Sequence, residues 1–315
     1  MTRFRVLAGT IALAAALAAC GSSSNPVGAS SPSSAGSAAG SASGSASGGG
    51  AIIVGSANFP ENVLLAEIYA GALKAKGVTV TKRLNIGNRE TYIPGLQDGS
   101  IDLIPEYTGN LLAYFDKKST ATTAADVYAA LPKALPSTLK VLDQSQAEDK
   151  DAIVVTKETA DKYKLTTIAD LAPVAKDLVL GGAPEFETRA DGVPGLKAQY
   201  GVTFKQFKKL DPGGPLTIAA LKNGQVQAAN IFTTDPSIAA NGWVALGDPK
   251  SLYTAQNVVP LVNGSKVSDT AGSALNAVSA KLDTKTLTDL VAQVVTDKKD
   301  PATVAADWLK TNSLG

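Results

Sequence analysis

Two aromatic residues of this sequence, Tyr107 and Phe232, stand at matching places in two segments that align without a gap at an offset of 125 residues. In each segment a helical pattern ends at a glycine, Gly99 or Gly224, and an apolar strand follows that ends at the aromatic residue. Ligands of open α/β sheets bind at the carboxyl ends of the strands. The two rings are therefore candidates for opposite walls of a binding cleft, although the same pattern also fits two core residues.

The composition favours binding over catalysis. The chain of 315 residues contains no histidine and one cysteine. Ser-His-Asp triads, Cys-His pairs, histidine-ligated metals and internal disulfides are therefore excluded. With 29 basic and 28 acidic residues, the net charge gives no reason to expect a nucleic-acid partner. We expect no enzymatic activity, no metal and no cofactor.

The first 50 residues predict a membrane tether rather than part of the fold. A basic start precedes an apolar stretch over 6–19, which is typical of a secretory signal peptide covering 1–19. The following Leu-Ala-Ala-Cys-Gly resembles the bacterial lipobox, in which the cysteine, here Cys20, is lipidated. Residues 20–50 would then be the lipidated cysteine and a flexible tether, because 26 of the 30 residues after the cysteine are Ser, Gly or Ala. The alternative is an ordinary signal peptide with an incidental cysteine.

The rest of the chain alternates strand and helix patterns, which predicts an α/β fold with a largely parallel sheet. Apolar residues have helical spacing over 61–76 and about 90–97, and the tail from 269 to 311 is typical of helices. Short apolar or alternating runs predict strands; they cover 51–55, 78–84, 101–106, 151–156, 178–180, 204–207, 227–231 and 258–262.

Several motifs, taken in their order along the chain, resemble one known family. The first strand and its turn read Val-Gly-Ser-Ala-Asn-Phe-Pro-Glu over 54–61, and Asp-Leu-Ile-Pro-Glu-Tyr-Thr-Gly over 102–109 is the most recognisable match. Further matches lie at 184–194, 233–235 and 259–263. Together they resemble the substrate-binding proteins of bacterial ABC importers for glycine betaine, choline and related osmoprotectants, over nearly the whole body that follows the tether.

The resemblance implies a two-lobe, type II periplasmic-binding-protein-like fold that closes over one solute in the cleft between its lobes. Lobe 1 would take 51–148 and 257–315, and lobe 2 would take 149–256. The resemblance also implies a monomer, held by its lipid on the extracytoplasmic face of the cell membrane, that captures glycine betaine, choline, carnitine or a similar quaternary ammonium solute. Its partners would be a membrane permease and a cytoplasmic ATPase on separate chains.

The resemblance carries over part of a ligand site. Tyr107 and Phe232 match two rings of an aromatic cage, which holds a quaternary ammonium group through cation–π attraction. Arg189 matches an arginine that would hold a carboxylate, unless it pairs with Glu185 or Glu187 on the surface.

Four other positions depart from the family pattern. Asp151 and Gln256 stand where two further rings are expected, so the cleft is expected to keep only two rings. Asp151 would then be a counter-charge for a cation, or else an exposed acid. Asn110 replaces a threonine, and Asn58 is left to stand in for an anchoring lysine whose position is Ala57. These losses leave an alternative open, a neutral hydroxylated ligand such as a polyol, a sugar derivative or a phenolic compound.

Overall fold

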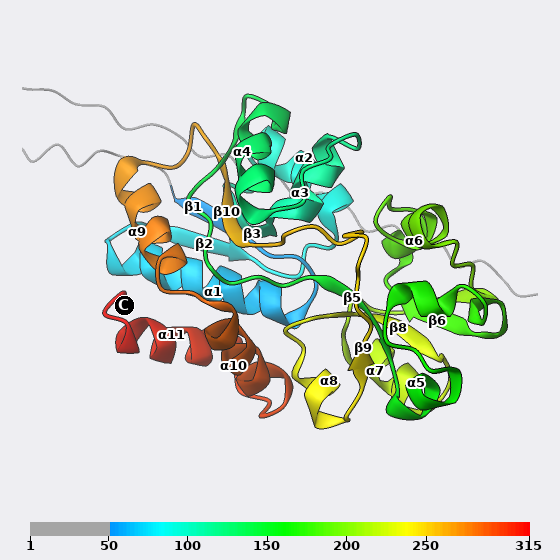
Figure 1. Ribbon diagram of the computed structural model, residues 1–315. Coiled ribbons are helices and arrows are strands. Elements are labelled where there is room, and N and C mark those ends of the chain that lie inside the picture. The colour runs from blue at the N-terminus through cyan, green and yellow to red at the C-terminus, as the bar shows by residue number, and fades with distance from the viewer. Residues whose placement is uncertain (1–50) are drawn as a thin grey trace, which may run out of the picture. The chain divides into compact units, whose positions relative to one another are not determined.

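The computed structural model describes residues 51–315, and Figure 1 shows them as two groups of strands with helices packed around each. The predicted signal peptide over 1–19, Cys20 and the predicted tether lie outside the described residues. Among residues 51–315, no helix is both long enough and apolar enough to cross a membrane. The described chain is an α/β body, as the strand and helix patterns predict. The expectation of a largely parallel sheet is wrong, because the strands form two mixed sheets in which four of the eight strand pairings are antiparallel.

The first sheet and the helices that cover it form lobe 1, which combines both ends of the described chain. Its strands are β1 (Ile52–Gly55), β2 (Val80–Arg83), β3 (Leu103–Tyr107), β4 (Leu139–Val141) and β10 (Val258–Asn263). Its helices are α1 (Pro60–Ala75), α2 (Arg89–Asp98), α3 (Thr108–Phe115), α4 (Ala124–Ala134), α9 (Asp269–Ser279), α10 (Thr284–Val295) and α11 (Pro301–Thr311). The strand order is β2-β1-β3-β10-β4, with β1 parallel to β2 and β3, and β10 antiparallel to both neighbours.

The second sheet and its helices form lobe 2 from the middle of the chain. Its strands are β5 (Asp151–Val155), β6 (Val179–Gly182), β7 (Gln206–Lys209), β8 (Ala228–Phe232) and β9 (Val244–Ala245). Its helices are α5 (Lys157–Tyr163), α6 (Val193–Tyr200), α7 (Pro215–Lys222) and α8 (Pro236–Ala240), with short 3-10 turns η1 (Ile168–Leu171), η2 (Ala175–Asp177) and η3 (Pro184–Glu187). The order β7-β6-β8-β5-β9 repeats the pattern of lobe 1, because β6 is parallel to β7 and β8 while β5 is antiparallel to both neighbours.

The sequence repeat corresponds to equivalent places in the two sheets. Tyr107 is the last residue of β3 and Phe232 the last residue of β8. Each residue lies opposite a residue of the neighbouring antiparallel strand: Tyr107 pairs with Val258 of β10, and Phe232 pairs with Asp151 of β5. Each sheet therefore presents one of the two aromatic residues at the end of its central strand, as the ungapped alignment predicts.

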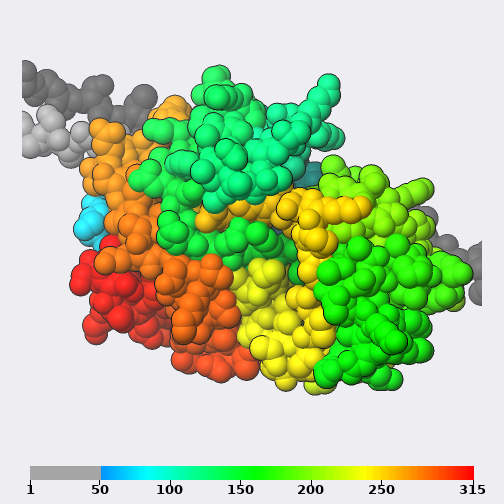
Figure 2. Space-filling view, viewed as in Figure 1, coloured from blue at the N-terminus to red at the C-terminus, as the bar shows by residue number. Residues whose placement is uncertain are grey.

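The C-terminal helices complete the core of lobe 1. A single hydrophobic cluster joins residues of α1 with residues of α9, α10 and α11, and Figure 2 shows orange and red C-terminal atoms beside blue atoms from the start of the described chain. The tail divides into three helices because Ser268, Asp283 and Asp300 each accept a hydrogen bond from a backbone N–H three residues further on. The predicted helical tail is confirmed.

Two chain segments connect the lobes and are hydrogen-bonded to each other. The backbone N–H of Asp149 donates to the carbonyl of Gln256 (3.1 Å), and that of Val258 donates to the carbonyl of Ala147 (2.9 Å). The second segment also packs tightly on the start of α3, where a Cβ on Gly109 would lie 2.5 Å from the Ala255 carbonyl oxygen. These paired segments are the chain connections between the two sheets.

We expect Gly109→Ala to lower the free energy of unfolding by about 1–3 kcal/mol, because the added methyl group overpacks the contact between α3 and the second connecting segment. Gly272→Ala is the matched control, since Gly272 lies in α9 and no atom lies within 4 Å of the place that an added methyl group would take. That change should stabilise the protein by about 0.5–1 kcal/mol through helix propensity. Denaturant unfolding measures both, and equal effects of the two changes would contradict the packing argument.

Candidate ligand-binding cleft

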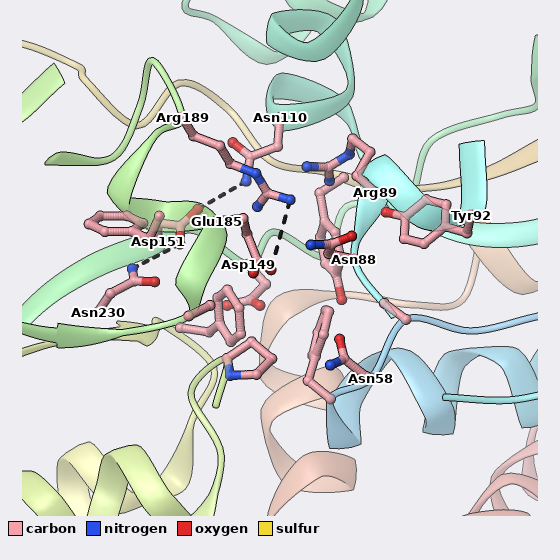
Figure 3. A pocket seen from close by; sticks show the side chains of 17 residues that line it. Asn58, Asn88, Arg89, Tyr92, Asn110, Asp149, Asp151, Glu185, Arg189 and Asn230 are labelled. Atoms are coloured by element: carbon pink, nitrogen blue, oxygen red, sulfur yellow. Dashed lines mark hydrogen bonds and ion pairs between the residues drawn. The ribbon is translucent and has the colours of Figure 1, made fainter. Parts of the chain in front are cut away.

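A cleft lies between the lobes, at the strand ends that carry Tyr107 and Phe232. Residues of both lobes line it, and Figure 3 shows their side chains pointing toward a common centre. About 50 Å³ of the cleft is open to the centre of a water molecule. This is several times the roughly 10–15 Å³ that a cavity needs in order to hold one water, so the cleft has open space between the two lobes.

Three aromatic rings form a continuous cluster across the two lobes. The ring centroids of Phe59 and Phe232 are 5.0 Å apart, and those of Phe59 and Tyr107 are 6.1 Å apart. Phe59 is the N-cap residue of α1, in the turn that follows β1. Tyr92 and Phe186 also line the cleft. The expectation that the cleft keeps only two rings is therefore wrong. Phe59 lies within the 54–61 motif, and its place just after a strand end was the signal in the sequence that could have identified it.

A buried carboxyl group behind the rings connects the two lobes. The Tyr107 hydroxyl donates to Oε1 of Glu61 (2.7 Å), and the Thr234 hydroxyl donates to Oε2 (2.5 Å). Asp149 is next to Glu61 and accepts a hydrogen bond from the backbone N–H of Thr234 (3.1 Å). The sequence contained no pattern that pointed to this group, because its members come from four separate segments.

The two carboxyl groups of this cluster both have raised pKa values. Burial raises the pKa of Glu61, even though the hydrogen bonds from Thr234 and Tyr107 favour its charged form. Burial and the neighbouring charge of Glu61 together raise the pKa of Asp149 well above its usual range. Two buried carboxyl groups in contact do not both ionise readily. The neutral form of at least one of these two carboxyl groups is therefore favoured behind the ring of Tyr107.

Asp151 lies inside the cleft, held by two amide groups. Asn230 donates through Nδ2 to Oδ1 of Asp151 (2.9 Å), and Asn110 donates through Nδ2 to Oδ2 (2.9 Å). Figure 3 shows the Asp151 carboxylate between these two side chains, which come from different lobes. Asp151 is 9% exposed, so the alternative that it is an exposed acid is wrong. Asp151 therefore presents its carboxylate to the cleft.

Gln256 lies behind Asn110. It is 1% exposed, and the residues that line the cleft do not include it. Its Oε1 accepts a hydrogen bond from the backbone N–H of Asn110 (2.9 Å), and its Nε2 donates to the Asn110 side-chain oxygen. Gln256 therefore does not face the cleft, in contrast to the prediction that it contacts a ligand directly. Instead, Gln256 positions Asn110, which lines the cleft.

Arg189 lines the cleft from lobe 2 and is bound mainly by a residue of lobe 1. Its Nε and Nη2 donate to the two carboxylate oxygens of Glu90 (3.1 and 2.8 Å). Glu185 is more distant, at 3.9 Å from Nη2, and Glu187 pairs instead with Lys209 (2.9 Å). The alternative that Arg189 pairs on the surface with Glu185 or Glu187 is therefore wrong about the main partner, which is Glu90. Burial disfavours the ionised form of Glu90, but Arg189 outweighs this effect and lowers the pKa of Glu90.

A second guanidinium group, that of Arg89, lines the cleft from lobe 1. Its Nε and Nη2 donate to the two carboxylate oxygens of Glu106 (2.8 Å each), and the Tyr92 hydroxyl donates to Oε1 (2.6 Å). Arg89 is 6% exposed, so this pair is part of the buried wall. Sequence reasoning missed Arg89, whose only signal was its place at the start of α2, just after the connection from β2.

The turn after β1 places Asn58 at the cleft. The backbone N–H of Ala57 donates to Oδ1 of Asn62 (2.7 Å), and Nδ2 of Asn62 donates to the carbonyl of Pro105 in β3 (3.0 Å). Asn62 therefore fixes the turn against the strand that ends at Tyr107. Asn58 is exposed and lines the cleft beside Phe59.

Known proteins with related sequences share this body. The family model for the substrate-binding domain of the ABC-type glycine betaine transport system matches residues 50–311. The chain is 31% identical over 271 residues to glycine betaine-binding protein YehZ of Escherichia coli, across 82% of this chain and 89% of that protein. A glycine-betaine-binding protein of Pseudomonas aeruginosa is 26% identical over 284 residues, across 83% of this chain and 88% of that protein.

A solved structure shows the same fold. The crystal structure of a glycine betaine/carnitine/choline ABC transporter matches with a TM-score of 0.66 at 23% identity, over 84% of this chain and 99% of that chain. The predicted two-lobe, type II periplasmic-binding-protein fold is therefore confirmed. The sequence match extends over nearly all of the described residues and includes every strand of both sheets. The chain belongs to the family of substrate-binding domains of ABC-type glycine betaine transport systems.

Proposed function

We propose that this protein captures one small quaternary ammonium solute, such as glycine betaine, choline or carnitine, between its lobes and delivers it to the permease of an ABC importer. The observation that carries the proposal is the ring cluster of Phe59, Tyr107 and Phe232, drawn from both lobes. A quaternary ammonium group has no N–H, so hydrogen bonds cannot hold it. Each aromatic face attracts such a cation by about 0.5–2 kcal/mol. The names of the sequence relatives support the same class of solute.

The polar groups of the cleft suit both ends of such a solute. Asp151 would supply a negative charge for the cation, in an orientation held by Asn110. Arg189 and Arg89 would suit a carboxylate, because a guanidinium group binds carboxylates through paired N–H donors. Asn58, exposed beside the rings, would add a hydrogen bond near the mouth of the cleft. A zwitterion such as glycine betaine and a simple cation such as choline both fit this set.

A neutral hydroxylated ligand fits the cleft less well. That alternative depended on a cleft with two rings and on Gln256 as a hydrogen-bonding ligand contact. Phe59 adds a third ring, and both the oxygen and the nitrogen of the Gln256 amide form hydrogen bonds with Asn110. Both sequence relatives named above are glycine betaine-binding proteins by name.

The lobe boundaries that we propose are 51–148 with 257–315 for lobe 1, and 149–256 for lobe 2. The backbone bonds between the connecting segments lie at these boundaries, because Asp149 pairs with Gln256 and Glu148 bridges to Asn257. Closing and opening would then be a rotation about these paired segments.

We also propose that the protein is a lipoprotein on the extracytoplasmic face of the cell membrane. Cys20 would become the first residue after removal of 1–19, and 20–50 would tether the body near the membrane. The lipidated cysteine would hold a monomer close to its permease, which acts with a cytoplasmic ATPase. These partners are separate chains in the proposed complex.

Isothermal titration calorimetry of the purified protein with glycine betaine, choline and carnitine tests the proposed solute class. We expect saturable heat and a micromolar Kd with at least one of them. Glycine is the matched control, because it keeps the carboxylate of glycine betaine and lacks the three methyl groups that contact rings; sorbitol tests the hydroxylated alternative. No heat with any of the three quaternary ammonium solutes, or equal affinity for glycine or sorbitol, would disprove the assignment.

A further inference from the structure

The contact between Arg189 and Glu90 joins the two lobes at the edge of the cleft. Glu90 follows Arg89 in the first turn of α2, and Arg189 follows η3 in lobe 2. Two N–H groups of one guanidinium edge, Nε and Nη2, meet the two oxygens of one carboxylate. This paired geometry is the one that a carboxylate-bearing solute would also adopt on Arg189.

Arg189 holds Glu90 less firmly than Arg89 holds Glu106. The side chains of Arg189 and Glu90 are 24% and 45% exposed, whereas those of Arg89 and Glu106 are 7% and 0% exposed. Glu106 also accepts hydrogen bonds from the Tyr92 hydroxyl and the Tyr107 backbone N–H. Release of Glu106 would leave several buried donors unpaired, but release of Glu90 only returns a half-exposed carboxylate to water.

Both guanidinium groups of the cleft act on Glu90. Its pKa is lowered against the effect of its burial, first by Arg189 and then by Arg89. Figure 3 shows the Arg89 and Arg189 side chains reaching toward each other from opposite walls. An anion is therefore favoured between them, and in the structure this anion is supplied by the protein.

We propose that Glu90 is a built-in substitute for a solute carboxylate and sets the selectivity of the cleft between zwitterionic and purely cationic quaternary ammonium solutes. The inference rests on the proposed function, because it concerns the carboxylate end of the solute. Choline, which has no carboxylate, leaves the Arg189–Glu90 pair in place and keeps this contact between the lobes. Glycine betaine has to displace Glu90 from Arg189, so part of its binding free energy is lost to that exchange.

Glu90→Gln tests this role with little change of shape. The variant keeps the length of the side chain and removes the charge that competes for Arg189. We expect the Kd of glycine betaine to fall by about threefold to fivefold, the upper part of the range that one half-exposed ion pair supports. The Kd of choline should stay within about twofold or rise. Calorimetry on the full-length protein measures both solutes, and circular dichroism confirms that the variant is folded.

Glu185→Gln is the matched control for charge alone, since its carboxylate lies 3.9 Å from the same Arg189 nitrogen but does not occupy the Nε–Nη2 edge. We expect it to tighten glycine betaine less than Glu90→Gln does. Glu67→Gln removes a surface pair with Lys82 and should alter neither Kd. Equal tightening by Glu185→Gln would reduce the effect to general electrostatics and overturn the inference.

The remaining outcomes separate this inference from the proposed function. If the wild-type protein binds choline or glycine betaine and Glu90→Gln weakens both equally, Glu90 is only a contact between lobes and the inference fails while the function stands. If Glu90→Gln leaves the Kd of glycine betaine unchanged, the inference also fails while the function stands. If neither the wild type nor the variant binds either solute, the proposed function fails and the inference falls with it.

Discussion

Tyr107→Leu is expected to weaken solute binding by at least about 30-fold, the equivalent of about 2 kcal/mol for one desolvated cation–π contact. The ring of Tyr107 is the one contributed by the sheet of lobe 1, and Phe59 connects it to Phe232 across the cleft. Leucine keeps an apolar side chain of similar bulk at a position that is 6% exposed, so the change mainly removes the ring face and the hydroxyl. Calorimetry with the best-binding quaternary ammonium solute measures the loss.

Tyr107→Phe separates the ring from the hydroxyl. Both variants remove the donor to Oε1 of Glu61, so both should lose about 1–3 kcal/mol of the free energy of unfolding. Only the leucine variant should lose the affinity, because phenylalanine keeps the ring face. If Tyr107→Leu retained the wild-type Kd within about twofold, Tyr107 would not be part of the binding wall.

Asp149→Asn is expected to stabilise the protein at pH 8 by about 1–3 kcal/mol, whereas most buried polar substitutions destabilise. The asparagine oxygen can keep the hydrogen bond from the Thr234 N–H, and its new amide can donate to the neighbouring Glu61 carboxyl group. The substitution thus removes the charge that burial and the neighbouring Glu61 disfavour at position 149. Thermal unfolding should show a Tm higher by several degrees.

The pH dependence has a definite sign. The pKa of Asp149 is raised by folding, so its contribution to stability is fully present below its ordinary pKa of about 4 and is lost as the pH rises through the folded-state value. Wild-type stability should therefore fall with rising pH above about pH 5, and Asp149→Asn should flatten that slope. Asp170 acts oppositely, because hydrogen bonds from Thr166 and Thr167 lower its pKa to about 2, and its contribution is lost only in stronger acid.

Asp143→Asn is the control for this experiment, since Asp143 is an exposed acid of lobe 1. Its replacement should leave both the Tm and the pH slope unchanged. A change of stability in Asp149→Asn that is the same at pH 5 and pH 8 would show that folding does not raise the pKa of Asp149.

The elements and their order were readable from the sequence because they depend on local patterns. Gly99 and Gly224 adopt positive φ values of 80° and 69° just beyond α2 and α7, as expected for glycines that end helices. The short edge strands β4 and β9 were not predicted, since three and two residues carry too little periodicity. The equivalence of Tyr107 and Phe232 was also visible, because it is encoded by two ungapped segments.

The composition of the cleft depended on contacts between distant segments. Glu61 and Thr234 are 173 residues apart, and Glu90 and Arg189 are 99 residues apart. No local pattern specifies such pairs, because each forms only when both lobes pack against the same connecting segments. Motifs and strand ends in the sequence thus led to the family, the fold and two of the rings. The third ring, the buried pair of Glu61 and Asp149 and the partner of Arg189 were set by tertiary packing, which alone brings these charges and rings within contact distance.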